Sequence, residues 1–163
     1  MKNLTASEKH TRNIWLFSFN FAGMRVSDVL RAKWSDINDN RLHYIMHKYS
    51  KLLSLKISEK ILFVLKNYAG DRTHEKDFIF PELKTANKKF NSHLKTICVK
   101  AKIDKKVTMH IARHSFGNIA GDSIHRLMLQ KLYRHSDLKT TLNYQANFIH
   151  KDTDEALDSV LNF

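Results

Sequence analysis

The chain has few of the residues that build special frameworks. It contains one cysteine, Cys98, in 163 residues, which excludes a disulfide within the chain and any metal site with several cysteines. One proline and four glycines leave no flexible or proline-rich linker that would divide it into modules. No apolar stretch approaches the roughly 18 residues of a membrane helix, and no signal peptide opens the sequence. We therefore expect a soluble, cytoplasmic protein with a single domain over residues 1–163, in which Cys98 is a core thiol.

Acidic residues are scarce relative to basic ones. There are 28 Lys and Arg against 16 Asp and Glu, a net charge of +12. Four of the acids and no Lys or Arg lie in the last twelve residues, 152–163, so the preceding residues are more basic still. A surface this basic suits a polyanion such as nucleic acid, because each neutralised phosphate releases counterions. A charge excess that only keeps the protein soluble is the alternative.

Helical patterns dominate the sequence. A capping box, Thr5-x-x-Glu8, precedes an apolar segment that ends at Gly23, which predicts a buried helix. Further helices are predicted at about 26–32, 59–68, 85–101, 110–120, 123–133 and 138–144, and from an Asp152-x-x-Glu155 capping box onward.

The strand signals are short. Leu42–Met46 and Leu52–Ile57 flank a basic, polar segment, which predicts a hairpin. Phe78–Phe80 is a third candidate strand, because Pro81 after it cannot donate to a ladder. The predicted fold class is mainly α with a small antiparallel β-sheet, α+β.

Two arginines and a histidine are suited to binding phosphate. His110 and Arg113 are three residues apart, so on a helix they share a face. A guanidinium fork matches phosphate oxygens, and an imidazole adds a further hydrogen bond. Arg25 follows Gly23, which permits a sharp turn, and begins the next predicted helix, with Asp28 placed to orient it. A solvated basic face would give the same pattern.

A lysine, a histidine and a tyrosine complete a possible reaction centre. Lys48 lies in the predicted hairpin turn, where a mobile ammonium could protonate a leaving alkoxide, and Lys51 is its rival. Tyr144 follows His135 by nine residues. A tyrosine hydroxyl, with a pKa of about 10, becomes a useful nucleophile only when cations or hydrogen bonds stabilise its phenolate. The other four tyrosines are interpreted as core residues: Tyr44, Tyr49, Tyr68 and Tyr133.

Together these residues resemble the catalytic domain of the tyrosine recombinases, the phage integrase family. The resemblance rests on their order and on the runs G-M-R-V-S-D, H-K-Y-S-K, H-I-A-R-H-S-F and Y-R-H-S-D-L-K-T-T-L-N-Y, and it covers roughly Glu8 to Phe148. Two positions depart from the pattern: Arg134 replaces the usual glycine before His135, and Tyr49-Ser50 replaces the Thr-Gly that often follows the lysine.

The resemblance implies a DNA strand transferase with a 3′-phosphotyrosyl intermediate. Its catalytic residues would be Arg25, Lys48, His110, Arg113, His135 and Tyr144. No metal or cofactor is expected. The expected partners are double-stranded DNA and, on DNA, further copies of the full-length enzyme in a tetramer, with a monomer in isolation. The N-terminal DNA-clamping domain of the family is expected to be absent from this chain. A non-catalytic DNA-binding module of the same fold and a type IB topoisomerase are the alternatives.

Overall fold

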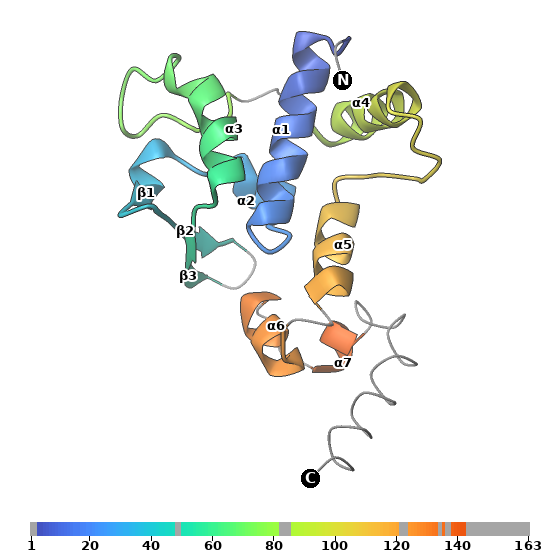
Figure 1. The fold of residues 1–163 in the computed structure, drawn as a ribbon. Coiled ribbons are helices and arrows are strands. Elements are labelled where there is room, and N and C mark those ends of the chain that lie inside the picture. Colours follow the sequence, from blue (N-terminus) through green and yellow to red (C-terminus); the bar gives the residue numbers. More distant parts are fainter. Residues whose placement is uncertain are drawn as a thin grey trace. The chain divides into compact units, whose positions relative to one another are not determined.

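The computed structural model describes residues 3–47, 50–81, 86–120, 124–133, 135 and 138–142 (Figure 1). The chain divides into two compact units between Arg113 and His114, and each is described by itself. The helices are α1 (Ala6–Asn20), α2 (Val26–Val29), α3 (Glu59–Ala69), α4 (Ala86–Lys100), α5 (Ile111–Ala120), α6 (Arg126–Tyr133) and α7 (Leu138–Leu142). The strands are β1 (Ile37–Asn38), β2 (Arg41–Met46) and β3 (Lys51–Lys56), and a short 3-10 turn, η1, covers Trp34–Asp36.

Helix α1 is the centre of the first unit. Its predicted capping box is confirmed: the Glu8 amide donates to Thr5 Oγ1 at 3.2 Å, and the Thr5 amide donates to Glu8 Oε2 at 2.7 Å. Lys100 of α4 adds an ion pair to Glu8 at 2.8 Å. Helices α2, α3 and α4 all contact α1, and Figure 1 shows it between α3 and α4. This helix is therefore the scaffold on which the rest of the unit is assembled.

The predicted hairpin is confirmed, and a different third strand joins it. β2 and β3 pair antiparallel, with Tyr44 opposite Leu53. The third strand is β1, joined to β2 by a two-residue turn in which Asp39 (φ 49°) and Asn40 (φ 57°) are left-handed. The prediction of a strand at Phe78–Phe80 was wrong. That segment makes one isolated bridge, between Lys33 and Phe78, because Ile79 and Phe80 instead place their side chains in the core.

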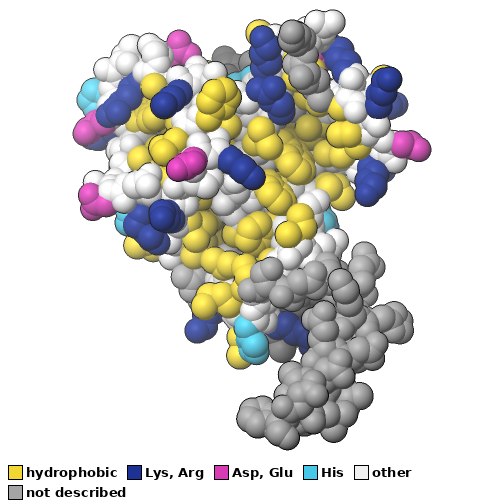
Figure 2. Space-filling model, viewed as in Figure 1, with side chains coloured by type: hydrophobic (Ala, Val, Ile, Leu, Met, Phe, Trp, Pro, Cys, Tyr) yellow, Lys and Arg dark blue, Asp and Glu magenta, His cyan; other side chains and the backbone are white. Residues whose placement is uncertain are grey.

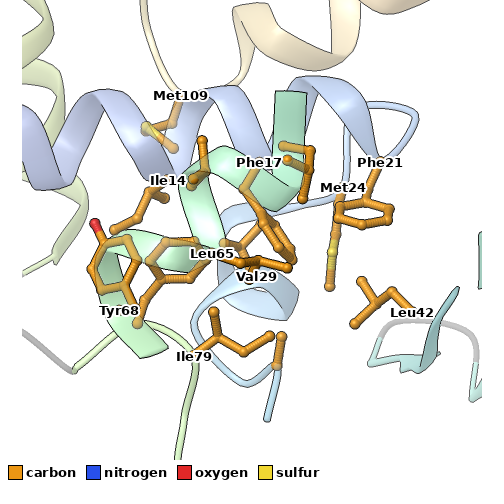
Figure 3. Packing of buried hydrophobic residues seen from close by; sticks show 14 of the residues in the cluster. Ile14, Phe17, Phe21, Met24, Val29, Leu42, Leu65, Tyr68, Ile79 and Met109 are labelled. Atoms are coloured by element: carbon orange, nitrogen blue, oxygen red, sulfur yellow. The ribbon is translucent and has the colours of Figure 1, made fainter. Parts of the chain in front are cut away.

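A continuous apolar core lies beneath α1. The ring of Phe17 on α1 packs at a tilt of 53° against that of Phe21, which caps the helix, with 4.5 Å between the centroids, and Phe80 meets Phe17 edge to face at 5.1 Å. Figure 3 shows core residues from α1, the turn after it, α2, β2, α3 and the segment before α5, among them Ile14, Phe17, Met24, Val29, Leu42, Leu65 and Met109. Met109 anchors the segment that leads into α5 in this core.

The predicted helices within the described residues are confirmed, with ends that differ by up to three positions. Helix α2 stops at Val29 rather than position 32, and α6 starts at Arg126 rather than position 123. The last helix predicted, from Asp152 onward, lies outside the described residues. Cys98 is buried, as expected for a core thiol. Among the described residues, no helix is long and apolar enough to cross a membrane.

The second unit is small and has its own packing. Tyr133, at the end of α6, is fully buried and lies 6.3 Å from the Phe116 ring of α5. The ring of His135 meets Tyr133 edge to face at 5.3 Å. Helices α6 and α7 pack against each other. His135 lies in the segment that connects them and is buried.

Candidate active site

Three of the predicted site residues line one cavity of the first unit. Arg25, His110 and Arg113 surround a pocket of about 460 Å³. Its remaining walls come from the turn after α1, the start of α2, helix α4 and the segment before α5, namely Gly23, Met24, Val26, Ser27, Asn91, Thr108 and Met109. Residues some 85 positions apart in sequence are thus brought together, with two guanidinium groups and an imidazole around one space.

Gly23 allows Arg113 to reach this pocket. The turn after α1 is left-handed at Ala22 (φ 53°) and Gly23 (φ 66°). A Cβ on Gly23 would lie 2.4 Å from the Arg113 Cα, so α5 can approach the turn only because glycine has no side chain. The Arg113 Nη1 donates to the Gly23 carbonyl oxygen at 3.2 Å, and Arg113 is 3% exposed. The guanidinium is therefore held in place by the backbone beside Arg25.

His110 reaches the pocket from a turn rather than from a helix. It is exposed and directly precedes α5, which begins at Ile111. A shared helix face, predicted from the spacing, is therefore not what unites His110 and Arg113; the Arg113 amide instead donates to the His110 carbonyl oxygen at 3.1 Å. The indole Nε1 of Trp15 donates to the Thr108 carbonyl oxygen at 3.1 Å and fixes the preceding segment.

Asp28 lies behind the arginines. It is 4% exposed, and its Oδ1 accepts a hydrogen bond from the His47 amide at 3.3 Å. Burial raises the pKa of the Asp28 carboxyl, and the positive charges of Arg25, Arg31 and Arg113 oppose that rise. The Asp28 carboxyl therefore interacts with the arginines of the pocket and also accepts a hydrogen bond from His47, the residue directly before Lys48.

His135 is fixed within the second unit. Its Nδ1 lies 3.0 Å from Thr141 Oγ1, and both residues are buried. Gln130 Nε2 donates to the His135 carbonyl oxygen at 3.2 Å, while the His135 amide donates to the Gln130 carbonyl at 3.3 Å. Because a hydroxyl can donate to a ring nitrogen or accept from it, this contact orients the His135 ring and leaves both tautomers open.

Lys48 and Tyr144 lie outside the described residues. Their placement in the site stays a prediction, as does the choice between Lys48 and Lys51, which begins β3. On the face of the protein shown in Figure 2, Lys and Arg side chains are more frequent than Asp and Glu, as the net charge of +12 requires.

The sequence matches the model of the phage integrase family over residues 1–150. The chain belongs to the phage integrase family. Among curated proteins, this integrase-family chain is 33% identical over 131 residues to the tyrosine recombinase XerA of Pyrococcus furiosus, a match that covers 75% of the chain. The chain spans 45% of the length of that relative.

The fold of this family member is that of tyrosine recombinase catalytic domains. It superimposes with a TM-score of 0.73 on the Tn1549 transposon integrase solved with transposon right end DNA, at 14% identity, covering 99% of this chain and 61% of that one. With the catalytic domain of bacteriophage HP1 integrase the TM-score is 0.61 at 18% identity, covering 90% of this chain and 79% of that one.

Sequence reasoning missed three residues that build the site. Trp15 and Asn91 lie on α1 and α4 and hold the segment before His110, but nothing in their sequence surroundings marks them. Thr141 belongs to the T-T pair between His135 and Tyr144, so a signal was present there. Its contact with the His135 ring depends on the turn between α6 and α7, which the pattern alone does not specify.

Proposed function

We propose that this chain is the catalytic domain of a site-specific DNA recombinase that cleaves and rejoins DNA through a 3′-phosphotyrosyl intermediate. The observation that carries the proposal is the cavity in which Arg25, His110 and Arg113 converge. Membership of the phage integrase family supports it. So does the basic charge of the residues before position 152, which suits a phosphate backbone.

In the proposed reaction, Tyr144 Oη loses its proton to solvent and attacks the scissile phosphorus. A bond forms between the phenolic oxygen and phosphorus, and the bond between phosphorus and the 5′ oxygen breaks. The departing 5′ oxygen takes a proton, which we assign to Lys48. The reverse reaction, with a 5′-hydroxyl of a different strand, completes the exchange. Because the phosphodiester energy is kept in the tyrosyl linkage, the reaction consumes no nucleotide.

The arginines supply the electrostatic part of catalysis. Arg25 and Arg113 would hold the two non-bridging oxygens and stabilise the charge of the pentacoordinate transition state. The Arg113 guanidinium is preorganised for this role, because the Gly23 carbonyl oxygen accepts a hydrogen bond from it. Arg113 is also buried, so few water molecules around it have to reorient during the reaction. His110 and His135 would donate further hydrogen bonds to the same phosphate. Loss of one such preorganised donor typically costs about 3 to 4 kcal/mol of transition-state stabilisation.

The proposed partners are double-stranded DNA and other copies of the protein. The Tn1549 integrase, which has the same fold, was solved with transposon DNA. We propose that the full-length enzyme clamps DNA with an additional N-terminal domain and exchanges strands as a tetramer, while this domain alone is a monomer.

The test uses DNA that traps the covalent intermediate. A library of duplexes, randomised around one 5′-bridging phosphorothiolate, requires no knowledge of the target site, and its thiolate leaving group makes cleavage irreversible. Wild-type protein should form an adduct that survives SDS and maps by mass spectrometry to Tyr144. Tyr144→Phe should abolish the adduct and leave DNA binding unchanged, because only the nucleophilic oxygen is removed.

Tyr68→Phe is the matched control, because it removes a hydroxyl from α3 at a different cavity and should keep the adduct. An adduct that maps to another residue, or persists in Tyr144→Phe, contradicts the assignment. DNA binding without any adduct in the wild type would instead identify the chain as a non-catalytic DNA-binding module.

A further inference from the structure

Asn91 lines the same cavity as the catalytic arginines but belongs to none of the sequence motifs. It lies on α4 and its side chain is exposed, whereas its neighbour Phe90 is buried in the core. The residues across the cavity include Arg25, His110 and Arg113. Helix α4 therefore contributes one neutral polar side chain to the wall of the space around which the two arginines and His110 lie.

The orientation of the Asn91 amide follows from the hydrogen bond that its side chain makes. The Met109 backbone N–H donates to Asn91 Oδ1 at 3.0 Å. Because a backbone N–H is a donor, its partner must be the carbonyl oxygen and not the amino group, so the amide cannot be flipped. Within the part of the chain that the structure describes, Asn91 Nδ2 makes no hydrogen bond. Two N–H donors are thus left on a side chain at the cavity wall.

We propose that Asn91 contacts the DNA phosphate backbone through Nδ2 while its Oδ1 holds Met109 and so positions His110. This inference rests on the proposed function. Phosphate oxygens accept hydrogen bonds from asparagine side chains as well as from arginine and lysine. The Met109 side chain is anchored in the core and its amide is held by Asn91, so α4 and the segment that carries His110 would meet the same strand of DNA as one rigid surface.

A neutral donor differs from a cation in its salt dependence. Loss of Arg25 should lower the slope of log affinity against log salt by about 0.9, because one fewer counterion is released when DNA binds. Loss of a neutral Asn91 contact should weaken binding and leave that slope unchanged. This difference separates the proposed contact from a general loss of positive surface.

The experiment compares Asn91→Ala and Asn91→Asp in binding to a fluorescent duplex of arbitrary sequence, measured by anisotropy over a range of NaCl concentrations. Asn91→Asp keeps an oxygen for the Met109 amide but removes the donors and adds a negative charge. Asn91→Ala removes both contacts. We expect about tenfold weaker binding for Asn91→Ala at an unchanged salt slope, and a larger loss for Asn91→Asp. Asn38→Asp, at an exposed position of β1 outside this cavity, is the charge-matched control and should bind as the wild type does.

The side-chain NH₂ signals of Asn91 in a ¹H–¹⁵N spectrum of the wild type provide the direct readout, and they should shift when the duplex is added. Wild-type binding by Asn91→Asp would mean that Asn91 only holds the Met109 amide. Weak binding by Asn91→Asp with wild-type binding by Asn91→Ala would mean charge repulsion alone. Either result, or unmoved NH₂ signals in the DNA complex, overturns the inference. If the wild type itself binds no DNA, the proposed function fails instead.

Discussion

Replacement of Gly23 by alanine tests how closely the turn after α1 and helix α5 must approach. Gly23 has φ 66°, a left-handed conformation that costs an L-residue about 1 to 2 kcal/mol. The new Cβ would lie 2.4 Å from the Arg113 Cα, 2.8 Å from its Cβ and 2.9 Å from its Cγ. Carbon atoms in contact normally stand about 3.5 to 4.0 Å apart. The nearest neighbour is backbone and cannot rotate away, so α5 or the turn has to move.

The two costs together set the expected size of the effect. Overpacking of a well-packed site typically costs about 1 to 3 kcal/mol, which added to the backbone strain gives about 2 to 5 kcal/mol for Gly23→Ala. For a protein of this length, that loss lowers the melting temperature by roughly 4 to 20 °C. A displacement of Arg113 by about 1 Å would also slow formation of the tyrosyl adduct by about 100-fold, even in molecules that remain folded.

Gly70→Ala is the matched control for Gly23→Ala. Gly70 ends α3 with φ −69°, and a Cβ there would have no atom within 4 Å. That substitution should leave stability unchanged or raise it by about 0.4 to 1 kcal/mol. The assay is thermal unfolding of both variants by circular dichroism, followed by adduct formation at a temperature where both are folded. Equal melting temperatures and adduct rates for the two variants would refute the close approach of α5 to Gly23.

Three further predictions concern a buried histidine, the general acid and the acidic C-terminal residues. Burial lowers the pKa of His10 from 6.5, so below pH 6.5 the unfolded state takes up a proton that the folded state resists. The urea midpoint should therefore fall as the pH drops from 7.5 to 5, and a midpoint that stays constant over this range would contradict the reasoning. His10→Gln should reduce that dependence. Lys48→Ala should be inactive on ordinary DNA but active on the 5′-phosphorothiolate duplex, whose leaving group needs no proton; rescue of Lys51→Ala instead would assign the acid to Lys51. Deletion of residues 152–163, an acidic segment with apolar residues at helical spacing, should keep the thermal transition of the domain but weaken cooperative DNA binding; loss of that transition would show that the segment belongs to the core.

Much of the scaffold was predictable from local sequence because local interactions decide it. The capping box of Thr5 and Glu8 connects residues three apart, and the hairpin of β2 and β3 follows from two short strand-like segments on either side of a basic, polar one. The strand prediction at Phe78–Phe80 failed for a nonlocal reason. Three apolar residues before a proline are compatible with an edge strand and also with a loop whose side chains are buried. Here Ile79 and Phe80 pack into the core beneath α1, so the segment is such a loop.

The candidate site divides in the same way. The sequence by itself determined which residues are candidates for the chemistry, because Arg25, His110 and Arg113 have functional groups suited to phosphate and stand in an order that resembles one family. Only the tertiary structure decided how they meet. His110 and Arg113 come together through a turn held by Trp15 and Asn91, and Arg113 reaches the cavity because Gly23 leaves room for α5. Contacts of this kind join residues up to 93 positions apart. A short sequence pattern does not specify which distant residue will pack against it, so these contacts could not be predicted from the sequence.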